Sequence, residues 1–220
     1  MGEDARFAYF RSVDRLYGIN RLPLLNGVCV DLGAHIGAFS IRIVERTNCT
    51  IHAYEPDPDN YKTMLDLSKK HGVGGKIVGF REALSKNSGT TDLYLSSGEY
   101  KDAHTLFGKS GKTIPVATVT PETIFGRIDG TIPYCKSNCQ GGEYWLLKYF
   151  NDNNACLDRI ERLCVEIHLD LFDKHEIAET LRLLRLVISK KPIGLKVAFA
   201  QHKPGLISQA VKDELMVDTL

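Results

Sequence analysis

Between residues 28 and 80, short apolar runs alternate with segments of helical periodicity, and this alternation constrains the fold more than any other feature. The run Val28–Leu32 is β-rich and almost wholly apolar, which is typical of a strand buried on both faces of a parallel sheet. Strands are predicted at 28–32, 50–54 and 76–80, and helices at 38–46 and 60–70. This order indicates right-handed βαβ units, and therefore an α/β fold with a doubly wound, mostly parallel sheet.

After residue 88 the pattern changes. Gly89–Leu95 and Thr113–Val119 alternate polar and apolar residues and predict an added antiparallel hairpin, with Pro115 on an edge strand and a mobile loop at 96–112. The later predictions are a helix capped by Thr120 with Pro121 in its first turn, strands at 131–136, 162–168 and 195–200, and helices at 142–150 and 172–189. We therefore expect a single domain over residues 1–220, with residues 1–26 as an N-terminal helical lead-in.

Composition and charge exclude several classes of protein. The formal net charge is +1, which gives no overall electrostatic attraction for nucleic acid, so no nucleic-acid partner is expected. No apolar run reaches the ~20 residues of a membrane span, and the charged N-terminus does not look like a signal peptide. We therefore expect a cytoplasmic protein with six reduced cysteines. Cys135 and Cys139 lack the tight paired spacing of zinc ligands, so no metal site is predicted.

The turn after the first predicted strand is suited to a nucleoside-bearing ligand. Gly33, Ala34 and Gly37 are small enough to let a ligand approach the backbone, and the helix that follows offers unpaired N–H groups. In this architecture an acidic residue at the end of the next strand, about 20 residues on, binds the ribose hydroxyls. Glu55 occupies that position.

The identity of residue 35 separates two classes of ligand. In a dinucleotide fingerprint, G-x-G-x-x-G, the second glycine lets the pyrophosphate touch the backbone, and here His35 stands in its place. S-adenosylmethionine carries no phosphate and tolerates a side chain there. Asp31, at the strand end, could hold the cationic amino group of its methionine part. The alternative is an ordinary α/β turn that binds no ligand.

Several motifs resemble those of the FkbM-type methyltransferases. The segment Val30–Ser40 is similar to their D-x-G-A-N-x-G-x-x-S motif, and Tyr54–Tyr61 is similar to their acidic motif E-P-x-P-x-N. Val165–His168 resembles the E-x-H ending of a late core strand. The resemblance implies a Rossmann-like class I methyltransferase fold with S-adenosyl-L-methionine as cofactor. The cofactor-binding residues that it and the turn analysis predict are Asp31, Gly33, Ala34, His35, Gly37, Ser40, Glu55, Pro56, Glu82, Ala83 and Asn138.

One motif departs from the family pattern. The family shows K-x-D-x-E-G-x-E after its fourth core strand, whereas this chain has Lys136-Ser-Asn-Cys-Gln-Gly-Gly-Glu143. Asn138 and Gln140 therefore replace two acids, and an amide cannot act as a base. The predicted catalytic residues are His168 and Glu143, as candidate bases, together with Asn138. His168 could equally be a structural histidine at the strand end, and Glu143 could simply favour a helix N-terminus.

The resemblance implies O-methylation of a hydroxyl on a small molecule, a sugar or a lipid. Two alternatives stay open at this point. One is a cofactor-binding protein that has lost catalysis and acts as a partner or regulator, which Asn138 and Gln140 suggest. The other is an NAD-linked oxidoreductase, which His35 disfavours. Neither the methyl acceptor nor the oligomeric state can be derived from the sequence.

Overall fold

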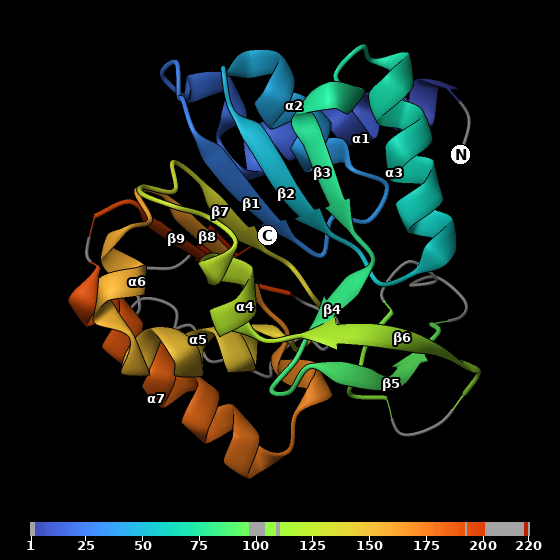
Figure 1. Ribbon diagram of the computed structural model, residues 1–220. Coiled ribbons are helices and arrows are strands. Elements are labelled where there is room, and N and C mark those ends of the chain that lie inside the picture. The colour runs from blue at the N-terminus through green and yellow to red at the C-terminus, as the bar shows by residue number, and fades with distance from the viewer. Residues whose placement is uncertain (1–2, 97–103, 109–110, 192, 201–217, 220) are drawn as a thin grey trace.

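A computed structural model describes residues 3–96, 104–108, 111–191, 193–200 and 218–219 of the chain. Its main sheet has the strand order β10-β9-β8-β7-β1-β2-β3, and every pairing described in it is parallel (Figure 1). The strands are β1 Val28–Leu32, β2 Thr50–Tyr54, β3 Ile77–Phe80, β7 Cys135–Ser137, β8 Leu163–Ile167, β9 Leu195–Phe199 and β10 Asp218–Thr219. The predicted doubly wound, parallel sheet is thus confirmed.

The order of the strands reverses between β1 and β7. From β1 the chain proceeds outward through β2 to β3, and from β7 it proceeds outward in the other direction through β8 to β9. Loops that leave β1 and β7 at their carboxyl ends therefore diverge to opposite sides of the sheet. In open α/β sheets such a reversal opens a crevice at the carboxyl ends of the strands, where ligands bind.

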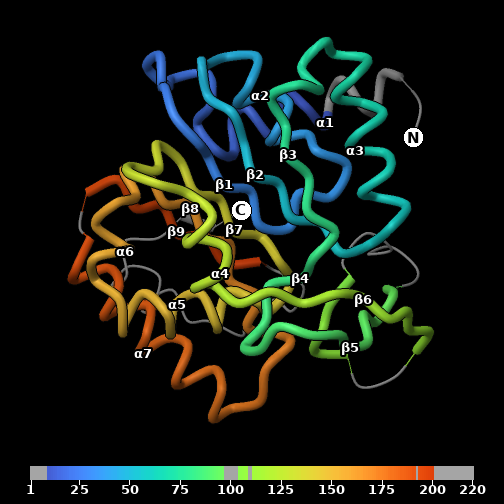
Figure 2. Tube along the Cα trace, viewed as in Figure 1, coloured from blue at the N-terminus to red at the C-terminus, as the bar shows by residue number. Residues whose placement is uncertain are grey.

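Helices cover both faces of this sheet. The helices are α1 Glu3–Leu16, α2 Ala38–Arg46, α3 Pro58–Lys70, α4 Pro121–Gly126, α5 Glu143–Asp152, α6 Asn154–Asp158 and α7 Lys174–Lys190, with short 3₁₀ turns η1 Ile19–Arg21, η2 Gly74–Lys76 and η4 Leu169–Leu171. Side chains of α1, α2 and α3 share one apolar cluster, and those of α4, α5 and α7 share another. Figure 2 shows these two groups of helices on opposite sides of the strands.

Alternate residues of one strand enter the two clusters. In β1, Cys29 packs with α1 and α2, whereas Val30 and Leu32 pack with the helices of the other face. Residues 29 to 32 are all fully buried. Burial on both faces explains why the run is apolar without alternation. It also makes the one acid within it, Asp31, an exception that needs a partner.

A second, smaller sheet lies beyond the carboxyl ends of β1, β2 and β3, toward which their arrowheads point in Figure 1. It contains β4 Glu82–Leu84, β5 Gly89–Tyr94 and β6 Thr113–Val119 in the order β4-β6-β5. The predicted antiparallel hairpin is confirmed, but sequence patterning missed β4, which pairs in parallel with β6. Pro115 lies beyond the stretch that β4 covers, so its strand is locally an edge, as predicted.

Capping groups fix several helix starts. Helix α3 begins at Pro58, two residues before the predicted start, because the Asp57 carboxylate accepts the N–H groups of Asp59 and Asn60. Thr120 caps α4, as predicted. Helix α7 begins at Lys174 rather than Phe172, because Asp173 and Glu176 form a capping box.

Other boundaries differ from the sequence-based prediction. The strand predicted at 131–136 is the three-residue β7, and Ile132 forms only an isolated bridge. The helix predicted at 142–150 runs to Asp152, and α6 was not predicted. Part of the predicted loop 96–112 lies outside the described residues; within the rest, Thr105 pairs with Tyr94.

The six cysteines are free thiols, five of them buried. Within the described ranges, no helix combines the length and the apolar character that crossing a bilayer requires.

Candidate functional site

A cavity of about 350 Å³ opens at the carboxyl ends of β1, β2 and β7, where the strand order reverses. Its walls come from the turns after β1, β2 and β7, from β4 and β5 of the small sheet, and from α1. Eight of the eleven predicted cofactor-binding residues line it: Gly33, Ala34, His35, Glu55, Pro56, Glu82, Ala83 and Asn138. The other three, Asp31, Gly37 and Ser40, lie behind this wall.

The turn after β1 is fixed from two sides. The N–H groups of Gly33 and Ala34 both donate to the Tyr54 carbonyl, over 3.0 and 2.9 Å, which ties the turn to the end of β2. A Cβ atom on Gly33 would lie 1.8 Å from the Asn138 carbonyl oxygen, and its φ of +75° already favours glycine. Glycine is thus required here by the crossing backbone of the loop after β7, whether or not a ligand also approaches.

Gly37 has a similar structural reason. It caps α2 with a φ of +82°, and a Cβ atom would meet the Met64 side chain at 2.5 Å. Met64 belongs to α3, so the glycine allows α2 and α3 to approach each other at this point. The residue shapes the turn and does not line the cavity.

Glu55 is a buried carboxylate at the end of β2. Its two oxygens accept the N–H groups of His35, over 2.8 Å, and Asp57, over 3.0 Å. Only 6% of the residue is exposed. Burial raises the pKa of Glu55 to about 7, and outweighs the two backbone donors, which favour the charged form. The free chain therefore holds this acid near half-ionisation at neutral pH.

Among the described residues, only His35 and Gln140 have a positive φ without being glycine, 53° and 51° respectively. Both line the cavity, one from the turn after β1 and the other from the turn after β7. Such conformations cost about 1 kcal/mol or more and persist where the surrounding structure imposes them. The cavity wall is therefore built from two strained turns that face each other across the switch point.

Asp31 is not presented to the cavity as the sequence-based prediction requires. Its carboxylate accepts from Lys136 Nζ over 2.9 Å and from the Ser40 hydroxyl over 2.7 Å, and the residue is fully buried. In this structure Asp31 therefore pairs with a cation of the chain, and its contact with a cationic ligand group stays a prediction. The same ion pair outweighs burial and raises the pKa of Lys136 above its ordinary value.

Lys136 lines the cavity in front of this acid. Its ammonium also donates to the carbonyl of Gly33 over 2.6 Å. It therefore links β7 to the turn after β1. The ammonium also contacts the Leu32 carbonyl at 3.4 Å, so its three N–H groups all have acceptors within the chain.

The amide of Asn138 occupies the position of a family acid and has a defined partner. Its Nδ2 donates to Glu166 on β8 over 2.6 Å and to the Tyr17 hydroxyl over 3.4 Å. An aspartate at this position would face the Glu166 carboxylate with like charge. The amide therefore suits its surroundings, and the acid nearest to it is contributed by the neighbouring strand.

The two predicted bases, Glu143 and His168, are fully buried and do not line the cavity. Glu143 accepts the N–H groups of Cys139 and Gly141, each over 2.7 Å, and so holds the turn after β7. His168 Nδ1 lies 3.2 Å from the same carboxylate. In this placement they hold residues 138–141 in position, and their role as bases stays a prediction.

The charges of this pair support each other. Burial alone would raise the pKa of Glu143, but the neighbouring imidazole and the backbone donors lower it below its ordinary value. Burial alone would lower the pKa of His168, but the Glu143 carboxylate raises it. An ionised pair in the core holds its geometry well, since each partner leaves a costly buried charge if the other is removed.

Helix α1 and the residue that follows it contribute one wall of the cavity, which the sequence did not indicate. Tyr9, Val13 and Tyr17 recur every four residues and line the cavity from one helix face. The Tyr9 ring meets the His35 ring edge-on, with centroids 6.3 Å apart. The four-residue spacing was visible in the sequence, but it is equally typical of a helix that packs on a sheet, so it does not by itself indicate a ligand site.

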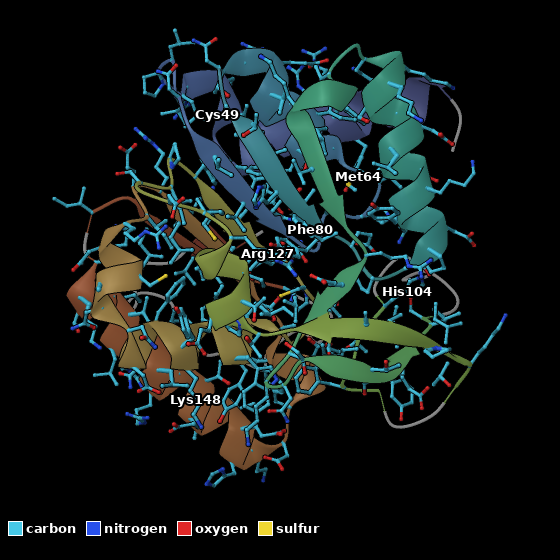
Figure 3. The ribbon with its side chains drawn as sticks, in the orientation of Figure 1. Cys49, Met64, Phe80, His104, Arg127 and Lys148 are labelled. Carbon is cyan, nitrogen blue, oxygen red and sulfur yellow. The ribbon has the colours of Figure 1, made fainter. Side chains whose placement is uncertain are left out.

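His104, in the segment predicted as a loop, is a second contribution to the cavity, and Figure 3 shows it below the end of α3. It lines the cavity, and its Nδ1 accepts the N–H of Ser96 over 3.1 Å. A neutral ring with that acceptor carries its proton on Nε2, which lies 3.8 Å from the Asp57 carboxylate. His104 therefore connects the segment after β5 to the N-terminus of α3 and is oriented as a donor.

Glu82 lines the opposite end and is bound by an arginine. Arg127 forms a two-pronged ion pair with it, over 2.6 and 3.1 Å, and lies 4.4 Å from the centroid of the Phe80 ring (Figure 3). Planar pairs of this kind hold a carboxylate in one orientation. Glu82 is thus a fixed, neutralised part of the rim.

No protein-family model and no curated protein sequence matches the chain. The resemblance to FkbM-type methyltransferases is therefore not confirmed. The ordered residues that carry it are nevertheless those that line the cavity or hold its turns.

Solved structures with weak similarity to the chain include the following three. A geranyl diphosphate methyltransferase in complex with SAM matches with a TM-score of 0.29 and 12% identity, over 32% of this chain and 29% of its own. A precorrin 8W decarboxylase of Methanobacterium thermoautotrophicum gives 0.37 and 15%, over 95% and 67%. A putative S-adenosyl-L-methionine-dependent methyltransferase of Methanococcus maripaludis gives 0.36 and 11%, over 96% and 62%. The chain spans less than a third of the first structure and about two-thirds of the other two. At these scores none of them supports a conclusion about this chain.

Proposed function

We propose that the chain binds S-adenosylmethionine in the cavity at the switch point and transfers its methyl group to a hydroxyl of a small molecule, sugar or lipid. The observation that carries the proposal is Glu55, a buried carboxylate at the end of β2, next to the turn Gly33–His35. A carboxylate at that point is where a nucleoside ligand of this fold class places its ribose hydroxyls.

The size and walls of the cavity support this ligand over a dinucleotide. A volume of about 350 Å³ lies at the lower end of the range for ligand pockets, roughly 300–1,000 Å³. The His35 backbone N–H is already bound to Glu55, so the turn does not offer it to a pyrophosphate. The ring wall of Tyr9 and Tyr17 further closes the side on which a second nucleotide would extend.

The structure changes the assignment for the amino-acid part of the ligand. Because Asp31 and Lys136 bind each other, and the Lys136 ammonium also donates to the Leu32 and Gly33 carbonyls, we no longer assign the methionine amino group to Asp31 and assign no ligand group to the ammonium. The Asp31–Lys136 ion pair keeps this ammonium charged and in place. Ala34 and Leu84 bring apolar surface to the cavity between the two polar ends.

Bound in this cavity, S-adenosylmethionine would supply a methyl group on a sulfonium centre that is already activated toward a nucleophile. The chain's own residues then have to align the acceptor, because correct alignment alone contributes up to about 7–11 kcal/mol. Asn138 and Gln140 line the switch-point side and can hydrogen-bond an acceptor hydroxyl, but cannot take its proton. O-directed transfer is supported by the motif resemblance.

A second candidate function is cofactor binding without methyl transfer. It is favoured by one observation, namely that both predicted bases, Glu143 and His168, are buried away from the cavity. In that case the chain would act as a partner or regulator that responds to the cofactor. The acceptor panel described below separates the two candidates.

Calorimetry with S-adenosylmethionine and its demethylated product tests the first half of the proposal. We expect the wild-type chain and the control Glu122→Gln, an exposed acid in the first turn of α4, to bind both ligands. Glu55→Gln should bind at least tenfold more weakly, because a charged hydrogen-bond acceptor is worth about 1.5–3 kcal/mol. If the wild-type chain binds neither ligand, both candidate functions are wrong.

Methyl transfer from labelled cofactor to a panel of sugars, lipids and small hydroxylated molecules tests the second half. Turnover in wild type that survives in His168→Ala, after correction for stability, would confirm that His168 only positions the turn. Binding without turnover on any acceptor, together with turnover in the variant that carries both Asn138→Asp and Gln140→Glu, would favour the second candidate.

A further inference from the structure

A second hollow lies on the far side of α1 from the cavity, between the ends of three helices. It encloses about 900 Å³ and is lined by α1, the last turns of α2 and α3, and η1. Tyr9, Val13 and Tyr17 face the cavity, whereas Arg11, Asp14 and Arg15 line this hollow. One helix therefore separates two different sites, and Figure 1 shows α1, α2 and α3 on the same side of the sheet.

The charged residues of this hollow are strongly unbalanced. Five cations line it and only one acid, Asp14; the cations are Arg11, Arg15, Arg42, Arg46 and Lys70. The whole chain, in contrast, carries 28 basic and 27 acidic residues. We call this hollow the basic groove. Its excess of positive charge is a local feature that the net charge of the chain conceals.

Arg42 and Asp14 form an ion pair with each other. Two hydrogen bonds, of 2.9 and 2.7 Å, join the Arg42 guanidinium to the Asp14 carboxylate, and both side chains are largely buried. This pair fastens α1 to α2 and raises the pKa of Arg42, chiefly through the hydrogen bond to Asp14. The pair engages the one acid among the residues that line the groove, and a second acid, Glu45, binds both Arg42 and His71.

Arg15, Arg46 and Lys70, three further cations that line the groove, are exposed. Among the described residues, no acid lies within ion-pair distance of Arg15, Arg46 or Lys70. Each stands in the last turn of a helix, where a cation stabilises the helix dipole even without a ligand. Three such ends meet in one groove, however, and like charges brought together repel unless an anion lies between them.

The groove also has one flat aromatic surface. The His71 ring stacks on Phe10 with centroids 5.3 Å apart and planes 7° from parallel, and its Nδ1 is held by Glu45 over 2.7 Å. About a third of the His71 side chain is exposed. A fixed ring beside arginines is a surface on which a planar group of a ligand can rest.

We propose that the basic groove binds a ligand that carries two or more phosphate groups. Arginine forks match phosphate oxygens in pairs, and the cations that line the groove come from three separate helix ends, so several anionic groups can be bound at once. The volume also exceeds what a single phosphate fills. This site is distinct from the proposed cofactor site, since no residue lines both hollows, although α1, α2 and α3 contribute to each.

Titration of the full chain with inorganic tripolyphosphate and with a twelve-nucleotide single-stranded DNA, at 50 and 200 mM salt, tests the proposal. We expect tripolyphosphate to bind and saturating S-adenosylmethionine to leave its affinity unchanged. Arg15→Gln with Arg46→Gln should weaken binding at least tenfold. Arg15→Lys with Arg46→Lys keeps both charges and should stay within a few-fold of wild type.

The control variant carries Lys148→Gln and Lys174→Gln, two exposed lysines far from the groove, and changes the net charge equally. Its affinity should stay within twofold of wild type. If the natural ligand is a nucleic-acid strand, Arg15, Arg46 and Lys70 predict a salt slope of about −2.1, or about 18-fold weaker DNA binding at 200 mM than at 50 mM salt. With Arg15 and Arg46 removed, the loss should fall to about two- to threefold. Binding of tripolyphosphate but not DNA would identify a small phosphorylated ligand as the source.

Three results would overturn the proposal. The first is that neither probe binds at 50 mM salt. The second is that the control variant loses as much affinity as the groove variant. The third is that S-adenosylmethionine displaces the probe, which would locate the probe in the cavity. A purely structural role of the cations would appear as a lower melting temperature of the glutamine variant with no anion binding in wild type. Failure of cofactor binding alone leaves these measurements interpretable, because they do not use the cavity.

Discussion

The buried acid at the end of β2 predicts a pH-dependent affinity for S-adenosylmethionine. The pKa of Glu55 in the free chain is about 7, and its ionised form accepts ribose hydroxyls much more strongly than the protonated acid does. Roughly nine-tenths of the acid is ionised at pH 8 and roughly one-tenth at pH 6. Affinity should therefore fall about tenfold between these values, or about 1.4 kcal/mol, as the pH falls through the pKa.

Calorimetry at pH 6, 7 and 8, at constant ionic strength, measures this effect. At pH 7 about half the acid is protonated, so binding should release about half a proton, which buffers of different ionisation enthalpy report. The ligand's own amino group also titrates, near pH 8. Glu55→Gln controls for that, because the ligand contributes the same pH dependence to both proteins.

The difference between the two proteins is the decisive quantity. Between pH 8 and pH 6, the factor by which affinity falls should be about ten times larger in wild type than in Glu55→Gln. The free energy of unfolding of the ligand-free chain provides an independent test. Because folding raises the pKa of Glu55, its contribution to stability should be lost as the pH rises from about 4.5 to about 7. Equal pH slopes in wild type and Glu55→Gln would refute the assignment of Glu55 to the ligand.

Three further predictions concern the turns around the cavity. Lys136→Met leaves a buried carboxylate without its counter-ion and should lower the free energy of unfolding in urea by about 3–5 kcal/mol. Gly33→Ala places a Cβ atom 1.8 Å from a carbonyl oxygen and should abolish cofactor binding, whereas Gly72→Ala, at a similar φ of +71° with open space around it, should cost only about 1 kcal/mol and leave binding intact. Asn138→Asp places a second carboxylate at the 2.6 Å contact with Glu166 and raises the pKa of one of the two acids. The melting temperature of this variant should therefore fall relative to wild type as the pH rises from 5 to 8. If the difference in melting temperature does not change with pH, the two groups do not face each other in solution.

Much of the fold could be predicted from local pattern. The first two strands and the helix between them were predicted to the residue, because an apolar run, a glycine turn and an amphipathic helix each leave a clear periodic signal. The three-residue β4 and β7 were missed or misplaced, since so short a strand is stabilised by its neighbours rather than by its own sequence. In the small sheet, β6 is long enough to leave a recognisable pattern in the sequence, whereas β4 is identified only by its pairing with β6.

The site was predicted less completely than the fold. The turn residues Gly33, Ala34 and His35 and the acid Glu55 line one cavity, as the motif spacing predicted. His168 and Glu143 were read as bases from residue type and position at a strand or helix end. The structure places both in the core, because the same pairing that makes a histidine reactive also stabilises it as a buried ion pair.

The sequence by itself determined that a carboxylate follows the second strand, that a glycine turn follows the first, and that the chain alternates strand and helix. These are short-range facts, and each has a local signature. Only the tertiary structure decided what those groups face. It placed Lys136, from a strand more than 100 residues along the chain, over Asp31, and it brought α1 across both the cavity and the basic groove. The sequence identifies a charged residue but not its partner. The partner depends on which strands lie side by side in the folded sheet, and so does whether the charge is left available to a ligand.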